Sequence, residues 1–432
     1  MVKSCIMPFM KNPRVSLVSF LLALLLVGGL IAFSPGTVSL KTSLNLIAGR
    51  FLRLPGETGD LTQHASRVMV LCAKEKFPPS CYDEEIPKLT DRISMEEAFA
   101  VVKTIQAKDP RYLYCHVVGH KLSDREVEKN PENWKDVITK CPKTFCNNGC
   151  LHGALLQRFN SETLSEKEIG EVLPDLKEVC EPRGTWKPVE VERSMCYHAL
   201  GHLALYITGA ATPRALALCR DIGTKSDNRN YVQTCTEGVF MQIFQPLEPE
   251  DFALIKDIAP SKEKVAAFCA PYRNDPDSGL AWSACRRESW PLSRKEILKP
   301  EGLMEFCSPV NNSPWYKNCF ASMLNIITIE LVVERERGSV EKLAEFCDGL
   351  QTQIPRETCF AQGARQLIQL DPRYAKEALA LCAAAQKRNL ADECYKALVL
   401  IGQWSFHPES EEFIHYCGTF PSPWNVTCRE SQ

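Results

Sequence analysis

The spacing of the cysteines constrains the fold of this chain more than any other feature. Of 21 cysteines in 432 residues, Cys5 precedes a long apolar run and the other 20 follow it. From Cys180 onward they fall into pairs whose members are 11 to 16 residues apart. The first members of successive pairs recur every 35 to 50 residues, which is close to the period of arrays of helical hairpins.

The sequence around each pair predicts a disulfide at the bend of a hairpin. The run Val-Ala-Ala-Phe-Cys269 reads as the end of one helix, and Cys285 begins the next helical run. In an antiparallel hairpin these positions are adjacent, at the Cα separation of about 5.5–6 Å that a disulfide prefers. Each bond would close a loop of about a dozen residues and contribute about 3 kcal/mol in the chain-entropy description. The predicted pairs are Cys72 with Cys81, Cys180 with Cys196, Cys219 with Cys235, Cys269 with Cys285, Cys307 with Cys319, Cys347 with Cys359, Cys382 with Cys394 and Cys417 with Cys428.

Four cysteines remain, namely Cys115, Cys141, Cys146 and Cys150, and they allow three connectivities. The repeat favours Cys141 with Cys150, which leaves Cys115 with Cys146. Thiolate metal sites and attached haem are the competing interpretation. No Cys-x-x-Cys occurs in the chain, so disulfides are favoured.

These patterns predict an all-α fold, an α-hairpin solenoid of about nine hairpins stapled by about ten disulfides. Over residues 64–432 the chain resembles the tetratricopeptide and Sel1-like superfamily of helical repeats in period and hairpin form. The Trp-x-x-Leu-Gly signature of tetratricopeptide repeats is absent, so no functional residue carries over. Solenoids often bind another protein on their concave face, and such a partner is expected here.

The N-terminus predicts a membrane anchor and an extracytoplasmic location. Residues 1–14 carry Lys3, Lys11 and Arg14, and residues 15–33 form an uncharged apolar run of nineteen residues. That length suffices to cross a bilayer of about 30 Å. Cleavage after Ser34 is the alternative to an uncleaved signal anchor, but Pro35 would follow the cut. Positive charge before the span predicts a cytoplasmic N-terminus and a periplasmic or extracellular remainder, where disulfides persist.

The rest of the chain divides into a linker at residues 34–62, N-terminal repeats at 63–245 and C-terminal repeats with a cap at 246–432. The net charge is −2 and the isoelectric point is near 6.5. Nothing in this balance indicates a nucleic-acid partner.

Histidines concentrate in the N-terminal repeats. Five of the eight fall in three short runs, Cys115-His116-Val-Val-Gly119-His120, Cys150-Leu-His152-Gly153 and Cys196-Tyr-His198-Ala-Leu-Gly201-His202. A fourth run, Cys235-Thr-Glu237-Gly238, has glutamate two places after its cysteine, where two of the other runs have histidine. Histidines four residues apart share one face of a helix and can hold a single ion.

This pattern predicts a transition-metal site. Its candidate ligands are His116, His120, His152, His198, His202 and Glu237, with Gln157 and Gln242 as partners that orient them. Imidazole and carboxylate without thiolate suit zinc, iron or copper. Because packed helices lie about 8–10 Å apart, the six ligands form either one convergent centre or two. Structural hydrogen bonding and a pocket for a polar organic ligand are the alternatives.

The expected function is therefore that of a metal-dependent protein, either a hydrolytic or oxidative enzyme or a metal-binding protein without catalysis. His-Glu-x-x-His is absent, which disfavours a zincin protease. A non-catalytic scaffold, in which the histidines are structural, is the competing hypothesis.

Overall fold

The computed structural model describes residues 60–430, apart from residues 110, 113–114, 143–144, 147–148, 160–162, 185, 226–228, 275–278, 311–315, 334–338 and 408–409. The described residues belong to a single compact unit. The predicted anchor at 15–33 and most of the predicted linker lie outside the described residues. Within the described part, no helix is both long and apolar enough to span a bilayer.

The described residues contain helices and no strand, which confirms the predicted all-α class. The α-helices are α3 (Leu61–Cys72), α4 (Pro78–Glu85), α5 (Met95–Lys108), α6 (His116–Lys129), α7 (Trp134–Lys140), α8 (Gly149–Arg158), α9 (Glu166–Glu178), α10 (Glu190–Ile207), α11 (Thr212–Gly223), α12 (Val232–Phe244), α13 (Pro249–Ile255), α14 (Val265–Cys269), α15 (Leu280–Glu288), α16 (Arg294–Ile297), α17 (Pro300–Cys307), α18 (Tyr316–Thr328), α19 (Val340–Asp348), α20 (Gln353–Leu370), α21 (Ala375–Gln386), α22 (Ala391–Ser405), α23 (Glu411–Gly418) and α24 (Trp424–Glu430). Short 3-10 helices are η1 (Pro87–Asp91), η2 (Pro131–Asn133), η4 (Lys262–Lys264), η5 (Ala270–Tyr272), η6 (Trp290–Ser293), η7 (Ser308–Val310) and η9 (Pro372–Tyr374), and η8 (Ile329–Val333) is a π-helical turn.

Local signals in the sequence explain where many of these helices begin. The side chain of Ser94 accepts a hydrogen bond from the backbone of Glu97, whose carboxylate accepts one from the backbone of Ser94. This reciprocal cap satisfies two donors that the first turn of α5 would otherwise leave unpaired. Ser339 caps α19 in a similar way, and Pro213 stands in the first turn of α11, where proline costs no hydrogen bond.

Twenty cysteines form ten disulfides, and every pair expected from the spacing is confirmed. Nine of the bonds join two successive helices at the bend of a hairpin. They are Cys72–Cys81, Cys141–Cys150, Cys180–Cys196, Cys219–Cys235, Cys269–Cys285, Cys307–Cys319, Cys347–Cys359, Cys382–Cys394 and Cys417–Cys428. Cys115–Cys146 differs, because it spans 31 residues and ties the start of α6 to the segment before α8.

The same device therefore recurs from the first hairpin to the last. Cys81 lies in α4 and receives the bond from the end of α3, and Cys428 lies in α24 and receives the bond from α23. Between them, Cys319 of α18 and Cys359 of α20 take the corresponding position early in the second helix of their hairpins. The cysteines assigned to disulfides from the sequence are thus all engaged, and none is available as a thiolate metal ligand.

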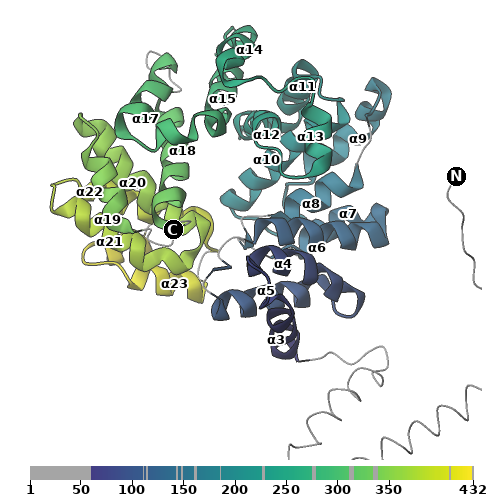
Figure 1. Ribbon diagram of the computed structural model, residues 1–432, viewed down its shortest axis with the longest axis horizontal. Coiled ribbons are helices and arrows are strands. Elements are labelled where there is room, and N and C mark those ends of the chain that lie inside the picture. Colours follow the sequence, from purple (N-terminus) through teal and green to yellow (C-terminus); the bar gives the residue numbers. More distant parts are fainter. Residues whose placement is uncertain are drawn as a thin grey trace, which may run out of the picture. The chain divides into compact units, whose positions relative to one another are not determined.

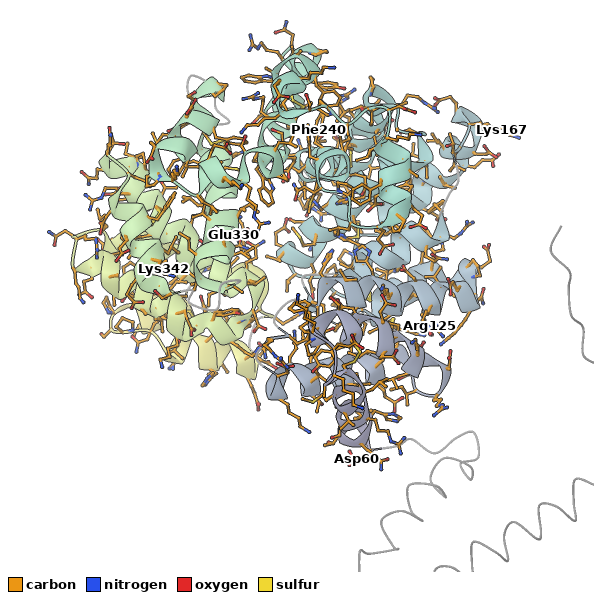
Figure 2. All side chains as sticks on the ribbon, in the orientation of Figure 1. Asp60, Arg125, Lys167, Phe240, Glu330 and Lys342 are labelled. Atoms are coloured by element: carbon orange, nitrogen blue, oxygen red, sulfur yellow. A yellow bond between two sulfur atoms is a disulfide. The ribbon has the colours of Figure 1, made fainter. Side chains whose placement is uncertain are left out.

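The second helices of successive hairpins pack on one another in the order α6, α8, α10, α12, α15, α18, α20 and α22 (Figure 1). Their facing side chains form the apolar core, in which Phe240 of α12 is fully buried (Figure 2). The resemblance to tetratricopeptide and Sel1-like repeats, and the division of the repeats at residue 245, stay predictions.

The last helices of the row lie beside the first. The Arg373 guanidinium donates a 3.4 Å hydrogen bond to Gln106 of α5, and His407 lies 3.8 Å from Glu192 of α10. Figure 1 shows α23 close to α5. A cavity of about 860 Å³ lies where these helices meet, with Lys103 on one side, His415 on the other and the Cys115–Cys146 disulfide in its wall.

Candidate metal centre

Three helices carry the five clustered histidines. His116 and His120 lie one turn apart at the start of α6, His152 lies in α8, and His198 and His202 lie one turn apart in α10. Because α8 packs between α6 and α10, its histidine lies between the other two pairs.

Glycines bring the helices close enough for the histidine side chains to meet. A Cβ atom built on Gly149 of α8 would lie 2.1 Å from the backbone oxygen of His116, and one built on Gly119 would lie 3.0 Å from the backbone nitrogen of Cys150. No side chain fits at the first position unless the two backbones move apart. The helices α10 and α12 repeat the arrangement, because a Cβ on Gly238 would lie 2.1 Å from the backbone oxygen of His198. Close packing of the helices therefore explains why glycine occurs within them, although glycine destabilises a helix interior.

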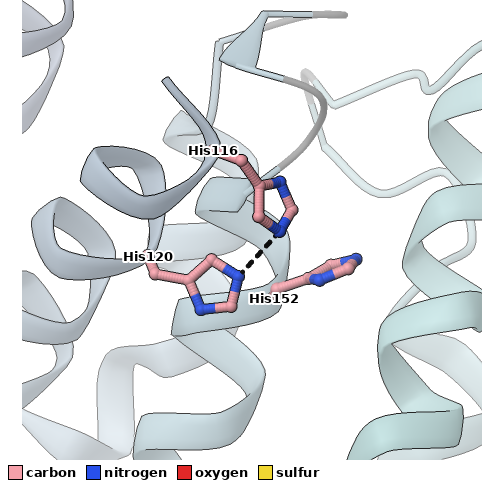
Figure 3. Close-up of side chains that lie close together, drawn as sticks. All are labelled: His116, His120 and His152. Carbon is pink, nitrogen blue, oxygen red and sulfur yellow. Dashed lines mark hydrogen bonds between the residues drawn. The ribbon is translucent and has the colours of Figure 1, made fainter. Parts of the chain in front are cut away.

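His116, His120 and His152 form the core of the cluster (Figure 3). Each offers one ligand atom, and these three atoms lie within 4.8 Å of one another. The Nε2 atoms of His116 and His120 are 3.1 Å apart. Two nitrogens on one tetrahedral zinc ion would be roughly 3.3 Å apart, given bonds of about 2.0–2.1 Å. The α6 pair is close to this separation, and the ligand atom of His152 lies within 4.8 Å of the ligand atoms of that pair.

His198 and His202 extend the cluster on the other side of His152. Their ring centroids lie 5.8 and 5.3 Å from that of His152 and 4.9 Å from each other. The five predicted histidines therefore converge. His116, His120, His152 and His202 are buried, and His198 is half-buried.

Two ring nitrogens in the cluster are buried without a hydrogen-bond partner, Nε2 of His152 and Nε2 of His202. His202 donates through Nδ1 to Oε1 of Gln242 at 2.5 Å, so its lone pair is on Nε2. Metal-binding histidines commonly donate their other ring N–H to an oxygen acceptor in this way, which fixes the tautomer. The structure thus gives Gln242 the geometry that its predicted role requires.

Four of the five histidines have pKa values below the usual range, which favours the neutral form that binds metals. Burial is the main cause that lowers the pKa of His120, His152 and His198 well below its usual value, and the neighbouring histidines add to the effect. Burial also lowers the pKa of His202, although hydrogen bonding to Gln242 and the charge of Asp251 oppose it. Because protons compete with metal ions for imidazole nitrogen, low pKa values favour metal binding at neutral pH.

Glu237 points to a different partner. Its carboxylate lies 2.7 Å from the Arg287 guanidinium, which is buried and also contacts Glu288 at 3.1 Å. It also accepts a 2.8 Å hydrogen bond from Gln233. Glu237 therefore serves as a counterion of Arg287, which is a buried cation.

The helix packing explains why Glu237 does not stand in the place of His152. When α8 and α12 are aligned by their cysteines, Cys150 matches Cys235 and His152 matches Glu237. The helix contacts give a different alignment. Gly149 faces the backbone oxygen of His116, and Gly238 faces that of His198, so these two glycines are the equivalent positions. This register is one helical turn later, and it places Met241 where His152 stands.

Met241 is the neighbour of the cluster that sequence reasoning missed. Its sulfur lies 3.1 Å from Nε2 of His198. The signal was present in the sequence, because Met241 follows Gly238 by three residues, as His152 follows Gly149. Gln157 is half-buried near the end of α8, and its role beside the site stays a prediction.

Acidic side chains lie beside the cluster. Burial raises the pKa of Asp124, one turn after His120 in α6, and the charge of Glu248 adds to this effect. Asp251 accepts hydrogen bonds from the backbone of Leu247 and from Tyr206, and its charge raises the pKa of His202 against the effect of burial.

Comparison with known proteins gives no relative from which a role could be transferred: no protein family, curated protein or solved structure matches this chain.

Proposed function

We propose that this chain is a membrane-anchored, extracytoplasmic helical-repeat protein that holds a transition-metal ion on His116, His120 and His152. The observation that carries the proposal is the convergence of three buried imidazoles from two helices, with ligand atoms within 4.8 Å of one another. Structural hydrogen bonding alone would not require so many uncharged imidazoles to share one interior space. His198 and His202 border the same space and supply further nitrogen donors.

The ten disulfides indicate an oxidising compartment. Together with the apolar run at 15–33, they support an anchored protein whose bulk faces the periplasm or the cell exterior. We infer that the row of hairpins is a solenoid of the tetratricopeptide and Sel1-like kind, with a concave face that can receive a protein partner. The packing of α6 through α22 one after another supports this architecture.

Imidazole ligands alone suit zinc, iron or copper. Three protein ligands leave a coordination position for water or substrate, which would allow hydrolytic or oxidative chemistry. The Cys115–Cys146 disulfide belongs to the lining of the large cavity, whereas the five clustered histidines do not.

Metal analysis of the disulfide-intact full chain tests the proposal. After loading with zinc, iron or copper and removal of loosely bound ions, we expect at least one equivalent of one metal per chain. The variant H116A/H120A/H152A should retain less than a tenth of an equivalent of zinc or iron. His415, which is exposed on α23, offers the matched control, and H415A should bind like the wild type. A wild-type chain that takes up none of the three metals would refute the proposal.

The second candidate function is a non-catalytic scaffold in which the histidines serve packing. The hydrogen bonds between His116 and His120 and between His202 and Gln242 favour it, because each places a buried polar atom beside a partner. The variant H116A/H152A/H198A separates the two functions. Unchanged stability and metal content in that variant would favour the scaffold.

A further inference from the structure

We propose that His198, His202 and Met241 form a second metal centre beside the first, and that its thioether ligand makes it selective for copper(I). This inference rests on the proposed metal-binding function and adds a ligand, a metal identity and a second ion. It puts Met241 in the place of Glu237, which the sequence analysis had included among the candidate ligands.

The contact between Met241 and His198 is the first support. The Met241 sulfur and the His198 Nε2 atom are 3.1 Å apart. A neutral imidazole carries one N–H and one lone pair. When the lone pair is on Nε2, it faces the Met241 sulfur, and one cation could bind both atoms.

The tautomer of His202 is the second support. Its Nδ1 donates to Gln242, and its Nε2 is buried without a partner. An unpartnered buried lone pair carries a desolvation cost, which a metal ion would relieve. Gln242 follows Met241 in α12, and His202 follows His198 by one turn in α10. One helix thus supplies two imidazoles, while the other supplies the thioether and the group that orients an imidazole.

The donor set indicates the metal. Two imidazoles and a thioether form a softer site than three imidazoles, and methionine sulfur selects copper(I) over zinc. Two donors of one ion can be at most about 4.4 Å apart, the sum of typical nitrogen and sulfur bond lengths, and the 3.1 Å separation of sulfur and nitrogen is within this limit.

Solvent access and charge are compatible with binding. His198 and Met241 are both half-buried, so an ion can reach this side of the cluster without unfolding it. Arg287 lies near enough to lower the pKa of His198, but Glu237 and Glu288 contact that guanidinium. The two carboxylates offset its positive charge beside the proposed copper(I).

Copper(I) titration of the full chain under anaerobic conditions tests the inference, with a chromophoric copper(I) chelator as competitor. We expect the wild type to take up two equivalents and X-ray absorption to show a sulfur ligand on copper. M241L should weaken the second equivalent roughly tenfold or more, since even the loss of a group that only supports a ligand costs 10–100-fold. The sulfur signal should disappear, while the zinc uptake of the first centre stays unchanged.

Two variants complete the test. M323L replaces a buried methionine of α18, far along the row, and should leave copper binding and the sulfur signal intact. H116A/H120A should remove the first centre and keep the copper–sulfur signal. If M241L binds both equivalents with wild-type affinity, the second centre is refuted while the first stands. If the wild type binds none of zinc, iron and copper, the proposed function itself fails.

Discussion

The pH dependence of stability offers the most direct measure of how the histidines are buried. We consider the metal-free wild type and the variant H120Q/H152Q/H198Q, in which three titrating groups are replaced by polar side chains that do not titrate. In the folded protein the pKa of each of these histidines is well below its usual value, chiefly because of burial. In the unfolded chain each should titrate near pH 6.5.

The sign follows from these pKa values. Below about pH 6.5 these three histidines are protonated in the unfolded chain but stay neutral in the folded chain. The wild type therefore loses stability as the pH falls. Between pH 7.0 and 5.5 each histidine that stays neutral when folded contributes about 1.2 kcal/mol to that loss, and three contribute about 4 kcal/mol. The variant lacks this contribution.

Carboxyl groups act in the opposite direction in both proteins. Burial raises the pKa of Glu288 to about 7 and that of Asp83 to about 6, so each favours the folded state as the pH falls through its own range. Taking the difference between wild type and variant removes their contribution.

Urea unfolding under non-reducing conditions with a chelator, at pH 7.0 and at pH 5.5, gives the four free energies required. We expect the difference in unfolding free energy between wild type and variant to shift by about 4 kcal/mol between the two pH values, against the wild type at the lower pH. If the difference in unfolding free energy between wild type and variant changes by less than about 1 kcal/mol between the two pH values, the imidazoles are hydrated and can be protonated in the folded state. That result would refute the burial of the cluster.

Two further predictions test the packing and the ligand assignment. G149A should destabilise the fold by about 1–3 kcal/mol or more and reduce metal uptake, because the new methyl group would lie 2.1 Å from the His116 backbone oxygen; G170A in α9, where no atom lies within 4 Å, should instead be neutral or stabilising in the same denaturation assay. E237Q should leave the metal content unchanged by elemental analysis, because Glu237 contacts Arg287 rather than the histidines; a loss of metal in this variant would return Glu237 to the ligand set.

The hairpins and their disulfides could be predicted from the sequence because their determinants are local. A cysteine at the end of one helix and another at the start of the next must lie close once the loop between them is short. Cys382 and Cys394 illustrate this, with a sequence separation of 12 and Cα atoms 5.4 Å apart. Even Cys115–Cys146, which is not at a hairpin bend, followed by elimination from the local pairs.

The ligand set could be predicted only in part because it depends on packing between hairpins. The i, i+4 pairs on α6 and α10 are properties of single helices, and their convergence with His152 followed from the repeat. The register between α10 and α12 is set by Gly201 and Gly238, whose backbones nearly touch. The cysteine spacing contains no information on that register. The sequence interpretation therefore assigned Glu237, and not Met241, to the position equivalent to His152.

The disulfides and the histidine cluster have different roles, and this difference bears on what a bound ion would do. Small structural zinc sites supply folding free energy to domains that have little core of their own. This chain has a continuous buried core along the row of hairpins, and its disulfides close loops that each contribute about 3 kcal/mol in the chain-entropy description. Glycines allow the close contact of α6 with α8 and of α10 with α12 that brings the histidines together. The buried lone pairs of His152 and His202 carry a desolvation cost that helix packing does not offset. A bound ion would offset that cost, so an ion explains the cluster better than helix packing alone does.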